Sequence, residues 1–208
     1  MIGIITADVV GSTKIPNAQR GMLPEVLQKL VAQLQTISPL RLEIYRGDSF
    51  QVEVEKFEKA PLIASLLRLG LMKESIDAFN KLDVRVSIGV GEVSYKGESV
   101  GQSDGEAYVL SGREFENIGK RRLKIKTSKS YKNDELNVLG IILDDLLTSM
   151  TVAQSKVVYE TLYNPSITQK AIAEKLSVAP QTINKALYSS KAFLVEIVLI
   201  RMETVLVK

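Results

Sequence analysis

The chain has 208 residues and a net charge of +3, from 27 basic and 24 acidic side chains. It contains no cysteine and no histidine, which excludes disulfides, thiolate zinc sites and catalysis by an imidazole base. Any catalysis would use carboxylates, amines, tyrosine or Mg²⁺ held by oxygen ligands. No apolar run reaches the roughly 18 residues of a membrane span, and the first residues lack the basic lead of a signal peptide. We therefore expect a cytoplasmic protein without membrane contact.

Apolar patterns predict alternating strands and helices in the first part of the chain. Residues 2–9 form an apolar strand, and residues 40–46 and 49–55 alternate apolar and polar side chains around Gly47-Asp48, a strong hairpin signal. Helices are predicted over 17–37, 58–82 and 105–118, and further strands over 84–90 and 122–126. This order, β-α-β-β-α-β followed by α-β, predicts an α+β fold with a ferredoxin-like antiparallel sheet and helices on one face.

A polar stretch over residues 128–135 indicates a boundary between two parts of the chain. We assign residues 1–132 to a first domain, 133–150 to a linking helix and 151–208 to an all-α domain. The last domain is predicted to contain helices over 151–163 and 169–176 and a third that begins at Pro180. Pro180 fits the first turn of a helix, where its missing N–H needs no partner.

The last domain has the pattern of a helix-turn-helix. Its predicted inward side chains are Ala171, Ile172, Leu176, Ile183 and Leu187, with Val178 filling the corner. Outward polar side chains would contact the bases and phosphates of double-stranded DNA. These candidate DNA-binding residues are Gln169, Lys170, Pro180, Gln181, Thr182, Asn184, Lys185 and Tyr188.

Residues 167–187 resemble the helix-turn-helix of sigma-factor region four and of MarR- and LuxR-like regulators. Ser177 stands where the turn usually has glycine. The resemblance implies DNA binding and transcription regulation. A helical hairpin that contacts only proteins remains an alternative.

Residues 193–207 are too apolar for a helix with one exposed face. This segment would pack on a second copy, giving a homodimer suited to palindromic half-sites, or on the helix over 151–163. The sequence leaves both alternatives open.

Two aspartates fall beside the ends of predicted strands: Asp8 after the first strand and Asp48 in the hairpin. If the hairpin pairs with the first strand, their carboxylates approach each other and could hold Mg²⁺ with a nucleotide triphosphate. Alternatively, both aspartates only cap turns. The candidate site comprises Asp8 and Asp48 as metal ligands and Gly11, Ser12, Thr13, Arg46 and Arg113 as nucleotide-binding residues.

The segments 7–13, 46–50, 85–91 and 105–113 resemble class III nucleotidyl cyclases and, more distantly, GGDEF enzymes, over residues 1–127. The resemblance implies a cyclase-like fold in which Asp8 and Asp48 bind the metals. Two positions depart from the pattern: Ile44 replaces the base-selecting lysine, and Val109 replaces the asparagine that stabilises the transition state. These departures favour nucleotide binding over catalysis, so we do not expect an active cyclase.

A cyclase-like domain followed by a helix-turn-helix resembles the SatD family of small bacterial proteins. The combination predicts a DNA-binding transcriptional regulator whose first domain senses a nucleotide. An Mg²⁺-dependent nucleotide-processing enzyme and a protein-only adaptor are the alternatives.

A basic run precedes the predicted boundary. It consists of Lys120, Arg121, Arg122, Lys124, Lys126, Lys129 and Lys132. The run could contact phosphates, or it could be a solvated sheet edge whose lysines prevent edge-to-edge pairing. We favour the sheet edge.

Overall fold

The computed structural model describes residues 1–12, 17–45, 47–75 and 81–208. Its strands are β1 (Ile2–Val9), β2 (Leu40–Ile44), β3 (Ser49–Val54), β4 (Val84–Gly91) and β5 (Leu123–Thr127). Its helices are α1 (Asn17–Leu34), the short 3-10 helix η2 (Phe57–Lys59), α2 (Ala60–Lys73), α3 (Glu106–Glu116), α4 (Ser130–Ser149), α5 (Val152–Tyr163), α6 (Gln169–Leu176), α7 (Pro180–Ser189) and α8 (Ala192–Val207). The predicted order of strands and helices is confirmed, and the fold is α+β.

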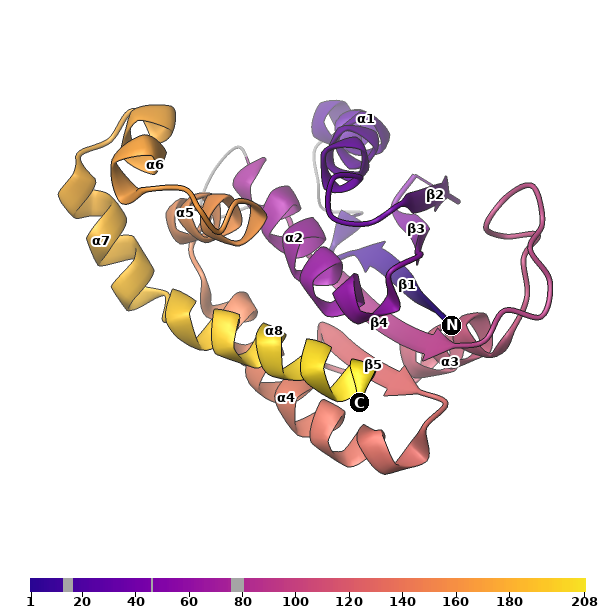
Figure 1. The fold of residues 1–208 in the computed structure, drawn as a ribbon. Coiled ribbons are helices and arrows are strands. Elements are labelled where there is room, and N and C mark those ends of the chain that lie inside the picture. The colour runs from indigo at the N-terminus through magenta and orange to yellow at the C-terminus, as the bar shows by residue number, and fades with distance from the viewer. Residues whose placement is uncertain (13–16, 46, 76–80) are drawn as a thin grey trace.

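The five strands form one sheet in the order β2-β3-β1-β4-β5 (Figure 1). Neighbouring strands are antiparallel except β4 and β5, which run parallel. The prediction of an entirely antiparallel sheet is therefore wrong at this edge. The reason is that α3 connects β4 to β5, and a crossover helix of this kind returns the next strand in the same direction.

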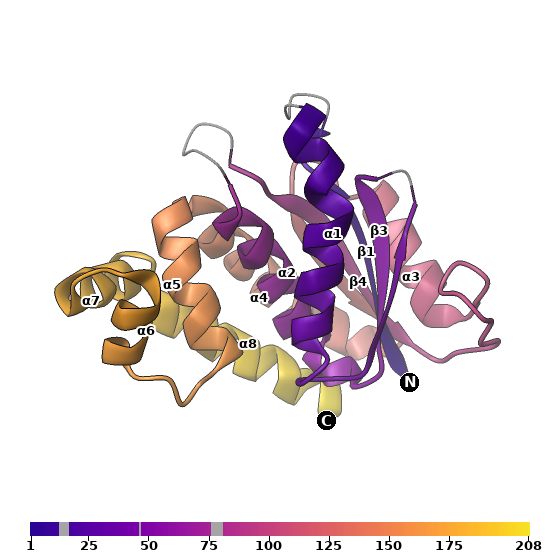
Figure 2. The ribbon, with the colours of Figure 1, turned by 90° about the horizontal axis from the view of Figure 1, so that it is seen from above.

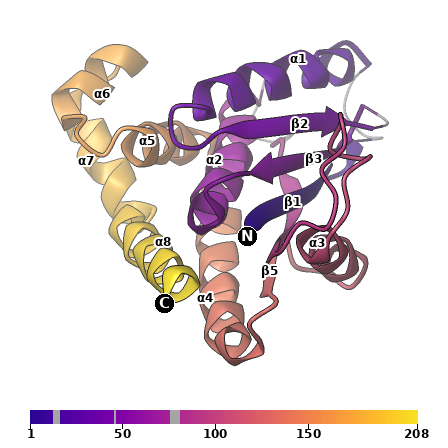
Figure 3. The same ribbon diagram turned by 45° about the vertical axis from the view of Figure 1, so that its right-hand side comes forward.

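Helices cover both faces of the sheet, so the prediction of helices on one face is wrong. α3 packs on one side of β1 and β4, whereas α2 and α4 pack on the other (Figure 3). On β4, the small residues Ser87, Gly89 and Gly91 face α3. A Cβ atom on Gly89 would lie 2.2 Å from the carbonyl oxygen of Ala107. The lack of side-chain bulk thus lets α3 lie directly on the backbone of β4.

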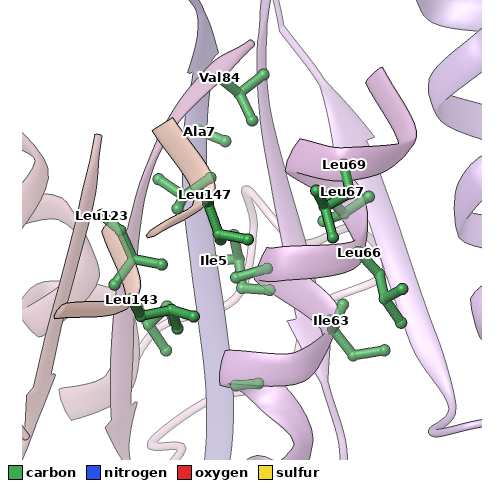
Figure 4. Close-up of a cluster of buried hydrophobic side chains, with 14 of the residues drawn as sticks. Ile5, Ala7, Ile63, Leu66, Leu67, Leu69, Val84, Leu123, Leu143 and Leu147 are labelled. Carbon is green, nitrogen blue, oxygen red and sulfur yellow. The ribbon is translucent and has the colours of Figure 1, made fainter. Parts of the chain in front are cut away.

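The main hydrophobic core lies between the sheet and helices α2 and α4. Ile5 and Ala7 point into it from β1, Leu66 from α2 and Leu147 from α4 (Figure 4). α2 is apolar around almost its whole circumference, which is the pattern of a fully buried helix. It contacts the sheet on one side and α1, α5 and α8 on the others.

This core extends into the C-terminal helices. Val158 and Tyr159 of α5, with Val195 and Met202 of α8, belong to the same buried cluster as the sheet residues. α5 packs on α2, and α8 packs mainly on α4 and η2. The division into 1–132, 133–150 and 151–208 remains a prediction, but α5 and α8 share their core with the first part of the chain.

Several predicted helix boundaries shift. α2 ends at Lys73, short of the predicted end at residue 82, and residues 76–80 lie outside the described residues. The third helix of the C-terminal module does not continue into the apolar segment, because Lys191 adopts a left-handed conformation (φ 54°) between α7 and α8. Among the described residues, no helix combines the length and the apolar character needed to cross a membrane.

Arg68 of α2 is fully buried and connects three elements. Its guanidinium donates to both carboxylate oxygens of Asp83, at 3.1 Å each, to Asp144 of α4 at 2.8 Å and to Thr148 at 2.9 Å. Arg122 adds a bond of 2.6 Å to Asp83. We refer to these five residues as the buried ion network. It fixes α4 to α2 and to the beginning of β4.

Candidate functional site

The two predicted metal ligands lie at one corner of the sheet. Asp8 is paired in register with Ser49 of β3 on one side and with Arg85 of β4 on the other. The backbone N–H of Val9 donates to the carbonyl oxygen of Asp48 at 2.9 Å. The structure therefore places Asp8 and Asp48 on neighbouring strand ends, as the hairpin pattern predicted.

Each of these carboxylates already has a partner in the protein. Arg85 Nη2 lies 2.6 Å from one oxygen of Asp8, and Ser49 Oγ lies 3.4 Å from the other. The hydroxyl of Ser12 donates to Asp48 at 2.6 Å. The turn beside them contains Gly11 at φ 65°, a left-handed conformation that suits glycine. Thr13 and Arg46, two predicted nucleotide-binding residues, lie outside the described residues.

The chemistry of Asp8 and Asp48 suits Mg²⁺, because carboxylate oxygens are the ligands that this cation prefers. The arrangement of the two side chains suits a metal ion less well. The described residues contain no cluster of three or more acidic side chains suited to a metal ion, and the guanidinium of Arg85 already neutralises Asp8. A metal at Asp8 and Asp48 would compete with Arg85 and Ser12 for these carboxylates, and this assignment remains a prediction.

Arg85 was not among the predicted site residues. Its guanidinium also lies 5.7 Å from the ring centroid of Phe115, so the last turn of α3 lies over this corner. Arg113, predicted to hold a phosphate, is exposed in the same turn. The alternation of side chains along β4 could have indicated Arg85, because it places this residue on the same face of the sheet as Ser87. Arg85 therefore adds a positive charge next to Asp8 that was not part of the predicted site.

The rest of this face of the sheet is held together by internal polar contacts. Glu53 is buried and accepts from Arg41 at 3.0 Å and from the hydroxyl of Tyr108 at 2.9 Å. Burial raises the pKa of Tyr108 to about 12, which extends the pH range over which its hydroxyl can donate to Glu53. Arg41 also donates to the carbonyl oxygens of Gly97 and Glu98. These hydrogen bonds hold the loop before α3 on the sheet. The polar groups involved satisfy one another's hydrogen-bonding capacity.

The structure has helices at the positions predicted for the two helices of a helix-turn-helix, but two of the predicted inward residues differ. Ala171 is only partly buried and lies outside the interior, which contains Ala173 instead. The hydroxyl of Thr168 caps α6 by accepting from the backbone N–H of Ala171 at 3.1 Å. Val178 is 40% exposed, so the prediction that it fills the corner is wrong. The backbone N–H of Val178 bonds to α6, which directs its side chain outward. The interior consists of Val157, Ile172, Ala173 and Ile183, and we refer to these four residues as the small cluster.

The residues predicted to contact DNA lie on the surface. α6 and α7 lie at one end of the molecule, away from the sheet (Figures 1 and 2). Ile183 anchors α7 inward and is fully buried, whereas Tyr188 is 82% exposed. All eight candidates are solvent-exposed: Gln169, Lys170, Pro180, Gln181, Thr182, Asn184, Lys185 and Tyr188.

The turn between α6 and α7 provides a stability test. Ser177 ends α6 at φ 54°, a conformation that is unfavourable for residues with a Cβ atom and natural for glycine. We expect Ser177→Gly to raise the free energy of unfolding by about 0.5–1 kcal/mol in urea titrations. Ala171→Gly is the control within α6 and should lower it by about 1 kcal/mol. An unchanged or lower stability for Ser177→Gly would show that the turn carries no such strain.

The basic run lies on β5 and its flanks. β5 is an edge strand, as predicted. Lys124 donates to the carbonyl oxygen of Asn117 at 2.7 Å and, with Lys126, lies near Glu114. Lys132 is buried and donates to the carbonyl oxygen of Leu206. Several of these cations therefore serve the fold of the chain itself, which supports the sheet-edge interpretation over a second phosphate-binding surface.

Comparisons with known proteins give a distant likeness to solved structures. No family model matches the chain, and no curated protein matches its sequence. A solved structure of a bacterial light-regulated adenylyl cyclase matches with 16% sequence identity and a TM-score of 0.44, over 60% of this chain and 74% of that one. At this TM-score the likeness assigns no function to the chain. The fusion of a cyclase-like domain to a helix-turn-helix, and the SatD resemblance, remain predictions.

Proposed function

We propose that the protein is a DNA-binding regulator that contacts double-stranded DNA through α7 and the beginning of α6. One observation carries the proposal: every side chain that the sequence assigned to DNA is exposed on the same two helices. Their inward side chains, Ile172 and Ile183, are buried in the small cluster. The recognition surface is therefore free of intramolecular packing.

The exposed groups have the chemistry of base and phosphate contacts. The amides of Gln181 and Asn184 can each donate and accept, which suits the base edges of the major groove. Lys170 and Lys185 supply positive charge for phosphates. Pro180 begins α7 without an unpaired N–H at the surface, and the N-terminal turn of a recognition helix is the part that enters the groove.

The Asp8–Asp48 corner is the proposed ligand-binding part, and a nucleotide with Mg²⁺ is the proposed ligand. The left-handed turn at Gly11, the guanidinium of Arg85 and the exposed Arg113 support binding of a phosphate group. Ile44 and Val109 depart from the cyclase pattern, which favours binding over turnover. When bound, the metal would supply positive charge to the phosphates.

A continuous set of contacts joins this corner to the C-terminal helices and supports a sensing role. The N–H of Val10 donates to the backbone oxygen of Asp83 at 2.8 Å. The side chain of Asp83 binds Arg68, which binds Asp144 of α4. α4 in turn packs on α8, the helix that follows α7. A change at the corner thus has a physical route to the recognition helix.

Titration of labelled duplexes by fluorescence anisotropy tests the proposal. We expect binding that weakens steeply with salt, because lysines displace counterions from the phosphates. Lys185→Ala should weaken all duplexes alike and reduce the salt slope by about one. Gln181→Ala and Asn184→Ala should instead relax the preference at one base pair, by about 1–3 kcal/mol.

Lys56→Ala is the matched control, because it removes one exposed lysine outside the helix-turn-helix. Repeating the titrations with ATP or GTP and Mg²⁺ tests whether the corner modulates affinity. Absence of duplex binding at low salt, with and without nucleotide, would refute DNA binding. Nucleotide turnover that depends on Asp8 would favour the enzyme alternative.

A further inference from the structure

α8 has two apolar faces, and the core covers one of them. The covered face packs on α4, α2 and η2 and consists of Val195, Val198, Leu199, Met202, Val205 and Leu206. On the opposite face Phe193, Ile197, Ile200 and Val207 are each 56–65% exposed. Four large apolar side chains in one exposed stripe are unusual for a protein surface. Contiguous apolar patches of this kind mark interaction sites.

The exposed residues of this stripe, together with the partly buried Thr204, follow a coiled-coil period. Phe193, Ile197, Ile200, Thr204 and Val207 are separated by four, three, four and three residues. This spacing corresponds to the a and d positions of a heptad, with Ile197 and Thr204 at a and the other three at d. The buried residues of α8 then fall at b, c and f, on the side away from the seam. The exposed stripe and the buried face therefore lie on opposite sides of α8.

The charges beside the seam select the partner and its direction. Glu196 and Glu203 occupy the two g positions. Leu194 and Arg201 occupy the e positions within α8, and Lys208, the C-cap of the helix, occupies the next one. In a parallel pair of identical helices, each g residue lies near the e residue five positions later in the partner. Glu196 then lies near Arg201 of the partner subunit, and Glu203 near Lys208 of the partner subunit. An antiparallel pair would instead bring like charges together.

We infer that α8 forms a parallel two-stranded coiled coil with α8 of a second copy of this chain. Within one protomer, Arg201 bonds to Glu135 and Glu203 to Lys59, and these side chains are exposed enough to interact with the partner as well. A seam of two heptads is short, but packing on α4 already holds α8 helical, so dimer formation does not have to order it. This inference is independent of DNA binding, because it concerns the protein alone.

Sedimentation equilibrium of the full chain without DNA tests the association. We expect a dimer for the wild type and a dissociation constant at least about tenfold higher for Ile200→Glu, because the charge would be buried in the seam. Tyr95→Glu is the matched control: it replaces a side chain of similar exposure (63%) outside α8. Glu196→Lys, a change beside the seam, should also weaken the dimer. A monomeric wild type, or a dimer that Ile200→Glu leaves unchanged, would overturn the proposal.

The absence of cysteine in the chain allows a clean test of direction. In a parallel pair, identical d residues face each other, so Val207→Cys should form a covalent dimer on mild oxidation. In an antiparallel pair the two positions 207 lie at opposite ends of the seam, and no cross-link would form. Glu116→Cys, exposed on α3, is the control that should remain uncross-linked. A dimer in which Val207→Cys does not cross-link would refute the parallel arrangement.

Discussion

Replacing Arg68 with methionine is expected to lower the free energy of unfolding by about 3–5 kcal/mol, because it leaves buried carboxylates without their main partner. Arg68 and Asp83 are both fully buried, and Asp144 is nearly so. Arg122 would remain as a partner of Asp83, but Asp144 would lose its guanidinium contact. Urea titration followed by circular dichroism measures the change.

Lys29→Met is the matched control, because Lys29 forms an exposed ion pair with Glu25. Such pairs contribute little to stability, so this variant should unfold like the wild type. In a double-mutant cycle, Arg68→Met with Asp83→Asn should be less destabilised than the sum of the single variants, because the two side chains interact directly. Additive effects would mean that the buried ion network does not act as a unit.

Gly89→Ala should lower the free energy of unfolding by about 3 kcal/mol or more, through overpacking. The added Cβ atom would lie 2.2 Å from the carbonyl oxygen of Ala107 and 2.4 Å from the backbone nitrogen of Ser111. Both are backbone atoms of α3, so no side-chain rotation relieves the clash. Thermal and urea unfolding would both report the loss.

Gly112→Ala provides the control on α3 itself. A Cβ atom at Gly112 meets nothing within 4 Å, and alanine is the better residue in a helix interior. This variant should therefore gain about 0.5–1 kcal/mol. If Gly89→Ala were as stable as the wild type, α3 would have to be able to lift from the sheet at no cost.

The sequence predicted the elements better than their arrangement. An apolar run located β1, alternation located β4, and Gly47-Asp48 located the hairpin, because these signals depend on neighbouring residues. The parallel pairing of β5 depends on contacts far apart in the chain, which local patterns do not specify. The small residues Ser87, Gly89 and Gly91 were nevertheless a sign that a helix lies on the second face of β4.

The same distinction between local patterns and distant contacts applies to the candidate sites. The exposed residues of α7 followed from helical periodicity around Ile183. The pairing of Asp8 with Arg85 did not, because the two residues meet only when β1 pairs with β4. The buried ion network was also missed, since its central residue, Arg68, stands in an apolar run and its partners come from three other segments.

The small size of the cluster beneath α7 has a dynamic consequence. α6 and α7 are anchored by Val157, Ile172, Ala173 and Ile183, whereas α5 and α8 belong to the large core. Local opening of a segment costs less free energy when fewer apolar contacts are lost. Amide hydrogens of α6 and α7 can therefore exchange with solvent through partial unfolding while the sheet remains native. Among the described helices, α6 and α7 are thus well suited to adjust their shape on contact with a partner.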